Sequence, residues 1–87
     1  MASPDHTRAV SNYMKVQLHV FEGVVEGRRQ TFALDVEPGA SVGELAQRVG
    51  APLERIGMVT IDGRLREIDD TVRPGQRVCL FPYVAGG

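Results

Sequence analysis

The chain has 87 residues, of which 43% are hydrophobic and 24% are charged, and its formal net charge is −1. This is the size and composition of one globular domain, and the near-neutral charge excludes a general nucleic-acid or anionic-membrane binder, because both need a basic face. The single cysteine, Cys79, excludes an internal disulfide, an iron–sulfur cluster and a structural zinc site.

Residues 1–13 are polar, contain Pro4 and show no periodicity, so they predict a flexible N-terminal tail. Asp5 and the lack of an apolar stretch there are unlike a secretory signal. The longest apolar run, Val78–Phe81, is far shorter than a membrane span. We therefore expect a cytoplasmic protein that binds neither membranes nor nucleic acids.

From residue 14 the pattern becomes that of a folded domain, which we expect to extend to residue 82. Apolar and polar residues alternate over residues 15–21 and again over residues 30–37, the pattern of two half-buried strands. Gly23 and Gly27 lie between these runs and are typical of turns. The two runs therefore predict a β-hairpin.

Residues 41–50 predict a helix. Ser41 and Glu44 have the spacing of a capping box, in which each side chain binds the other residue's backbone N–H. Gly50 suits the left-handed position that ends a helix, and Pro52 prevents its continuation. Four apolar residues form one stripe at helical spacing: Val42, Leu45, Ala46 and Val49.

Two further turns divide the rest of the chain. Asp62-Gly63 separates a strand from a short return strand, and Pro74-Gly75 precedes a last strand over residues 76–81. The helix between the hairpin and these strands allows the first and last strands to pair in parallel, which places the last strand centrally. The sequence thus predicts an α+β domain, a mixed sheet of four to five strands packed on one main helix.

The body of the domain offers no constellation typical of catalysis. His6 and His19 are isolated, which predicts no metal site, and Cys79 has mainly apolar neighbours and suits a structural thiol. The acidic run Glu67–Asp70 adjoins a turn and several arginines, so we interpret it as a solvated loop.

The C-terminal residues suit a different task. Pro82 cannot donate to a β-ladder, so we expect pairing to end at Phe81 and a flexible tail over residues 83–87. Gly86 and Gly87 lack Cβ atoms, and their backbone could enter a slot too narrow for other residues. An ionised α-carboxylate is a poor electrophile, so it would need activation, for example by ATP-driven adenylation.

The segment Val78–Gly87, VCLFPYVAGG, resembles the end of the ubiquitin-like sulfur carriers of the MoaD/ThiS family, which usually finish in FFPPVAGG. The resemblance extends over about residues 15–87 and implies a β-grasp, ubiquitin-like fold. Tyr83 replaces the family's second proline, and Pro74-Gly75-Gln76 replaces its frequent Asp-Gly-Asp turn.

The resemblance implies a cycle at Gly87. A ubiquitin-activating-type adenylyltransferase would consume ATP to convert the Gly87 carboxylate to an acyl-adenylate, and a persulfide sulfur donor would then convert it to a thiocarboxylate. A sulfur-accepting synthase would pass this sulfur to a small molecule. Val84, Ala85 and Gly86 would occupy the partner's channel. The chain would be a carrier rather than an enzyme, with no bound cofactor or metal.

The resemblance also implies a docking face beside the tail. Phe81 and Leu65 correspond to its apolar residues, and His19 stands where the family has an aromatic residue on the first strand. The family ending favours molybdopterin biosynthesis, while thiamin, cysteine, thiolated tRNA or a specialised metabolite remain open as destinations. Two alternatives also remain open: a protein modifier conjugated to lysines through Gly87, and a β-grasp interaction module without such chemistry.

Overall fold

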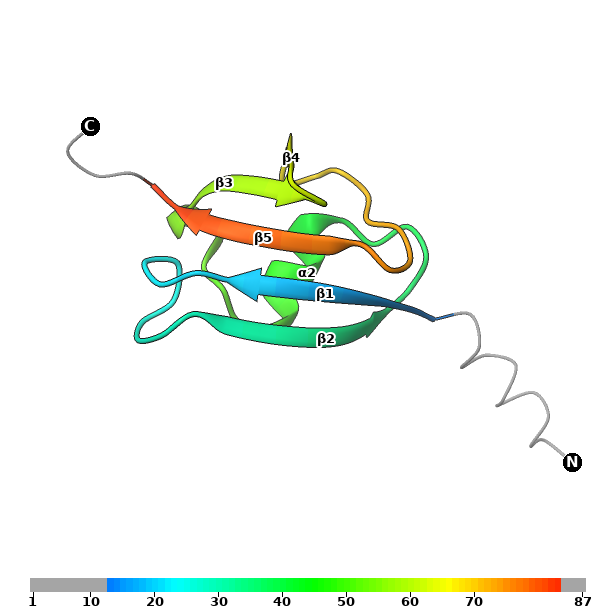
Figure 1. Ribbon diagram of the computed structural model, residues 1–87, viewed down its shortest axis with the longest axis horizontal. Coiled ribbons are helices and arrows are strands. Elements are labelled where there is room, and N and C mark those ends of the chain that lie inside the picture. The colour runs from blue at the N-terminus through cyan, green and yellow to red at the C-terminus, as the bar shows by residue number, and fades with distance from the viewer. Residues whose placement is uncertain (1–12, 84–87) are drawn as a thin grey trace, which may run out of the picture.

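The computed structural model describes residues 13–83, which form a five-stranded mixed sheet packed on a helix (Figure 1). The elements in chain order are β1 (Met14–Val20), β2 (Gln30–Val36), α2 (Val42–Arg48), the 3₁₀ turn η1 (Leu53–Arg55), β3 (Ile56–Ile61), β4 (Arg64–Arg66) and β5 (Arg77–Pro82). In these residues no helix is long and apolar enough to cross a membrane. The predicted α+β class, with a mixed sheet of four to five strands on one main helix, is confirmed.

The sheet has the strand order β2-β1-β5-β3-β4, so the last strand lies at its centre. β1 pairs antiparallel with β2 and parallel with β5, and β5 pairs antiparallel with β3. In Figure 1, β1 and β5 run side by side in the same direction, while α2 lies behind them. The parallel pairing and the central position of the last strand, both predicted from the helical crossover, are confirmed.

The helix begins with the capping box expected from its sequence. The Ser41 N–H donates to Glu44 Oε1 at 2.9 Å, and the Glu44 N–H donates to Ser41 Oγ at 3.2 Å. Gly50, just beyond the helix, has a φ of +78° and takes the left-handed position. The stripe is buried at its first three positions and partly buried at Val49, so the helix binds the sheet through the predicted face.

The core lies between α2 and the inner face of the sheet. The largest side chains there that are less than 2% exposed are Val16, Leu18, Val20, Val24, Val42, Leu45, Val72, Val78 and Leu80. They come from alternate positions of β1 and β5, from the helix and from loops. Among residues 13–83 no polar or charged residue is classed as buried, so burial of apolar side chains is what holds the helix on the sheet.

The tight turns also follow the sequence. Asp62 and Gly63 both have positive φ, +52° and +82°, as a type I′ hairpin turn requires. Gly75 has a φ of +80°, and the Gln76 N–H donates to the Arg73 carbonyl at 3.2 Å, which matches the predicted Pro-Gly turn.

The bounds predicted for the last strand, residues 76–81, were wrong by one residue at each end: β5 begins at Arg77 and includes Pro82, which is in register with Ile56. A proline lacks only the N–H donor; its carbonyl and its extended backbone still suit a strand. At the last position of a strand the missing donor costs little. The strand therefore carries the chain one residue further before Tyr83 leaves the sheet.

Candidate functional site: an open sheet face at the start of the tail

One face of the sheet is covered by α2 and the other is open, facing the viewer in Figure 1. Because side chains alternate along a strand, Leu18 and Val78 point into the core while His19 and Cys79 lie on the open face. The predicted docking residues His19, Leu65 and Phe81 all lie on this open face, so their positions relative to one another can be described.

His19 and Leu65 lie in one row that crosses the whole sheet. Strand register places Thr31, His19, Cys79, Thr60 and Leu65 opposite one another in turn. The row is polar near His19, whose Nδ1 lies 3.3 Å from the Thr31 hydroxyl and whose buried Nε2 has no hydrogen-bond partner. His19 and Leu65 are three strand spacings apart, roughly 14 Å, so their side chains do not touch each other.

Phe81 lies in the neighbouring row, next to an aromatic residue that the sequence analysis did not single out. Its ring stacks on Phe21, with ring centroids 4.6 Å apart and 21° between the planes. The Arg29 guanidinium lies 5.4 Å from the Phe21 ring centroid, within cation–π range. On its other side Phe81 is in register with Met58, which is 42% exposed. This second row is apolar and lies at the end of β5.

Leu65 reaches the same region from β4. Leu65, Met58 and Tyr83 all line one open hollow of about 460 Å³ beside the end of β5. Leu65 is 71% exposed and Tyr83 is 66% exposed, which are high values for large side chains with apolar bodies. Phe21 stacks on Phe81, Phe81 is in register with Met58, and Met58 shares the hollow with Leu65 and Tyr83. We call these five residues the exit patch, because they lie near the point where the chain leaves the sheet.

Of the three predicted docking residues, Phe81 and Leu65 thus belong to the exit patch, and His19 lies in the neighbouring polar row. The residue beside Phe81 on the first-strand side is Phe21, two positions beyond His19. A sequence signal for it exists: Phe21 continues the outward phase of Gln17 and His19 and immediately follows β1. Without the register of β1 against β5, however, neither position could be matched to Phe81.

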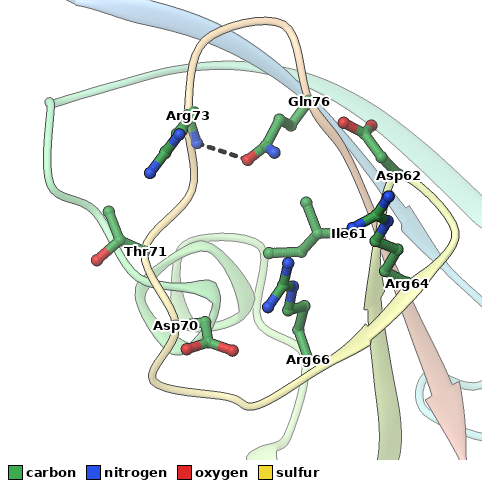
Figure 2. Close-up of a pocket in the computed structure, with 8 residues that line it drawn as sticks. All are labelled: Ile61, Asp62, Arg64, Arg66, Asp70, Thr71, Arg73 and Gln76. Atoms are coloured by element: carbon green, nitrogen blue, oxygen red, sulfur yellow. Dashed lines mark hydrogen bonds between the residues drawn. The ribbon is translucent and has the colours of Figure 1, made fainter.

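Another hollow lies at the start of β5 and has a volume of about 750 Å³ (Figure 2). Arg64, Arg66 and Arg73 line it, together with Asp62 and Asp70. Asp62 Oδ1 accepts the Arg77 N–H and Asp70 Oδ2 accepts the Glu67 N–H, each at 2.9 Å, so both carboxylates stabilise loop backbone. Because cations and anions are mixed here, we assign this hollow no ligand.

The remaining candidates of the described chain form no reactive cluster. Cys79 is a free, partly exposed thiol opposite His19. Within residues 13–83 no group of three His, Cys, Asp or Glu side chains is arranged to hold a metal ion. The predicted tail residues Val84, Ala85, Gly86 and Gly87 lie outside the described residues, so what the structure defines is the place from which they start.

A five-stranded mixed sheet around one helix, with the last strand central, defines the class of ubiquitin-like β-grasp proteins. The sequence matches the model of the family described as Mut7-C ubiquitin over residues 9–86. The chain therefore belongs to the Mut7-C ubiquitin family. No curated protein matches the chain.

Two solved structures are similar to the whole described fold. SAMP1 from Haloferax volcanii has a TM-score of 0.62 at 24% identity, over 84% of this chain and 99% of that one. A ubiquitin from Caldiarchaeum subterraneum has a TM-score of 0.58 at 26% identity, over 86% of this chain and 99% of that one. These likenesses and the family match confirm the predicted resemblance to ubiquitin-like, MoaD/ThiS-type β-grasp proteins.

Proposed function

We propose that this ubiquitin-like protein is a sulfur carrier, with Gly87 as the residue that is adenylated and then converted to a thiocarboxylate. The observation that carries the proposal is the position of Tyr83: this residue follows the central strand β5, precedes VAGG in the sequence and belongs to the exit patch. A partner that binds the patch therefore has the first residue of the tail at its surface.

The chemistry consists of three steps at Gly87, each of which is catalysed by or uses a partner protein. The Gly87 carboxylate attacks the α-phosphorus of ATP, which releases pyrophosphate and leaves a mixed anhydride with AMP. A persulfide sulfur then attacks the carbonyl carbon, so that a carbon–sulfur bond forms and AMP departs. A thiol reduces the resulting acyl disulfide, which leaves the thiocarboxylate, a soft and ionised sulfur nucleophile comparable to a thiolate.

The body of the chain supplies recognition to this cycle. Phe21, Phe81 and Tyr83 are aromatic residues of the kind that dominate the energetics of protein interfaces. Clustered exposed apolar side chains on a small soluble domain mark an interaction site. We assign the exit patch to the adenylyltransferase and, after loading, to the sulfur-accepting synthase. The chain is then a substrate of these enzymes and acts in the reducing cytoplasm, where Cys79 stays a thiol.

The destination of the sulfur is proposed from the tail sequence. Phe81-Pro82 followed by VAGG favours a molybdopterin-type synthase as acceptor; thiamin, cysteine, thiolated tRNA and specialised metabolites are the other destinations for the same group. A second candidate function is conjugation to protein lysines through Gly87. The likeness to a ubiquitin from Caldiarchaeum subterraneum supports this candidate.

Intact-mass measurement distinguishes the candidates. The chain is incubated with ATP, a persulfide source and the ubiquitin-activating-type adenylyltransferase of the same organism. A sulfur carrier gains the mass of one oxygen-to-sulfur exchange, whereas a modifier gives adducts of the chain on other proteins when lysate is added. A variant with one alanine added after Gly87 is the control and should stay unmodified. An unchanged wild-type mass would contradict both functions.

A further inference from the structure

We propose that Gly57 and Gly23 are positioning residues that fix the point and direction in which the tail leaves the sheet. This inference rests on the proposed function, since it concerns how the tail is presented for adenylation. Both glycines contact the Pro82–Tyr83 junction, one from each side of β5.

Gly57 lies where β3 is irregular. Ile56 is in register with Pro82 and Met58 with Phe81, so Gly57 is the extra residue of a bulge opposite the end of β5. A Cβ atom on Gly57 would lie 2.6 Å from both the N and Cα atoms of Tyr83, and 2.9 Å from the Pro82 carbonyl carbon. These are backbone atoms that cannot rotate away, so a side chain at residue 57 forces either the bulge of β3 or the start of the tail to shift.

Position 57 requires glycine because there is no space for a side chain, and not because its backbone angles exclude other residues. Gly57 does not have positive φ, so alanine could adopt its backbone angles. The turn glycines Gly39, Gly63 and Gly75 are the reverse case, with positive φ and nothing within 4 Å of an added Cβ. The space that a side chain at residue 57 would occupy is thus taken by the backbone of Pro82 and Tyr83.

Gly23 holds the same junction from the β1 side. It follows Phe21 in the loop after β1, has a φ of +103°, and an added Cβ would lie 2.7 Å from Cβ and Cγ of Pro82. The proline ring therefore rests directly on the Gly23 backbone. Because the ring also fixes φ of Pro82, the residue has little freedom to reorient.

A rigid origin matters because the tail must deliver a carboxylate to a reaction centre inside another protein. Once a partner has bound the exit patch, the entrance of the partner's channel is at a fixed position relative to Phe81 and Tyr83. A fixed junction reduces the ordering that binding must impose on the tail. Displacement of a reacting group by about 1 Å can slow a reaction about a hundredfold.

The test compares Gly57→Ala with Gly39→Ala. Gly39 has a φ of +90° and no neighbours for an added Cβ, so its replacement strains the backbone without touching the tail. ATP–pyrophosphate exchange with the adenylyltransferase of the same organism gives kcat and KM for each chain. Gly57→Ala should lower kcat about tenfold to a hundredfold, with KM within about twofold of wild type, because docking is preserved while delivery is not. Gly39→Ala should leave both constants unchanged.

Thermal unfolding of each variant separates positioning from folding. The inference is overturned if Gly57→Ala is adenylated at the wild-type kcat, or if its loss matches that of Gly39→Ala at equal loss of stability. If Gly57→Ala does not fold, Gly23→Ala is used, and it should show the same fall in kcat. Failure of the wild-type chain to be adenylated is a distinct result, because it removes the sulfur-carrier proposal itself together with this inference.

Discussion

Phe21 and Phe81 stack at the end of the parallel strand pair, with ring centroids 4.6 Å apart. Phe21 follows β1 and Phe81 lies near the end of β5, so the rings meet immediately before the chain leaves the sheet. An aromatic pair of this geometry contributes about 0.5–1.5 kcal/mol beyond the area it buries. The pair therefore joins the strand ends and presents aromatic surface at the origin of the tail.

Replacing either ring should weaken binding of the adenylyltransferase. Phe21→Ala and Phe81→Ala should each raise Kd about tenfold, since truncating a central aromatic residue of an interface costs on the order of 1–2 kcal/mol. Isothermal titration calorimetry measures this. Lys15→Ala is the control, because Lys15 is 71% exposed and its partner Asp35 lies away from the exit patch. Wild-type affinity in both aromatic variants would show that the exit patch does not bind the adenylyltransferase.

His19 should matter far less than Phe21 for the same binding. Its Nε2 has no hydrogen-bond partner and it lies in the polar row beside Thr31 and Cys79. His19→Ala should therefore change Kd by less than about twofold, as is usual for substitutions outside an interface centre. A loss equal to that of Phe21→Ala would show instead that the partner reaches across the sheet.

A substitution at the N-terminus of α2 should lower the stability of the domain without changing the rate of sulfur loading. Ser41→Ala removes the capping box and should destabilise the domain by about 1 kcal/mol, which corresponds to a fall in Tm of about 4–8 °C at this size. Circular dichroism during heating gives Tm. The variant should still be loaded with sulfur at the wild-type rate at 25 °C, because Ser41 lies on the face of the sheet opposite the exit patch.

Deleting Gly86 and Gly87 should give the converse result. The buried core consists of residues between Met14 and Leu80, so we expect Tm to change by less than about 1 °C while loading is abolished. Intact-mass analysis and the same melting experiment are run on one sample. A large fall in Tm would mean that the last residues contribute to the fold rather than to the chemistry.

Much of the architecture follows from local sequence signals. The alternation of apolar and polar residues predicted both strands of the hairpin, and Ser41 with Glu44 predicted the start of the helix. The turn at Asp62-Gly63 could be predicted because few residue types adopt the positive φ that it requires. The central place of β5 followed from one rule, that a helical crossover permits parallel pairing. These features depend on residues close together in the chain.

The site could be predicted only in part because it depends on pairing between distant strands. The family resemblance named Phe81 and Leu65 as expected docking residues, but not Phe21, because its place beside Phe81 is set by the register of β1 against β5. Gly57 gave no signal either: in sequence it is one glycine in a strand, and its contact with Tyr83 exists only once β3 lies against β5.

The most direct measurement of the central claim uses the protein from its own cells. Trypsin cleavage after Arg77 releases the peptide of residues 78–87, VCLFPYVAGG, whose mass can be determined by tandem mass spectrometry. We predict a population in which one sulfur atom replaces an oxygen atom at Gly87. If every copy of the peptide has an unmodified carboxylate, in cells growing with an intact activating enzyme, the chain is not a sulfur carrier.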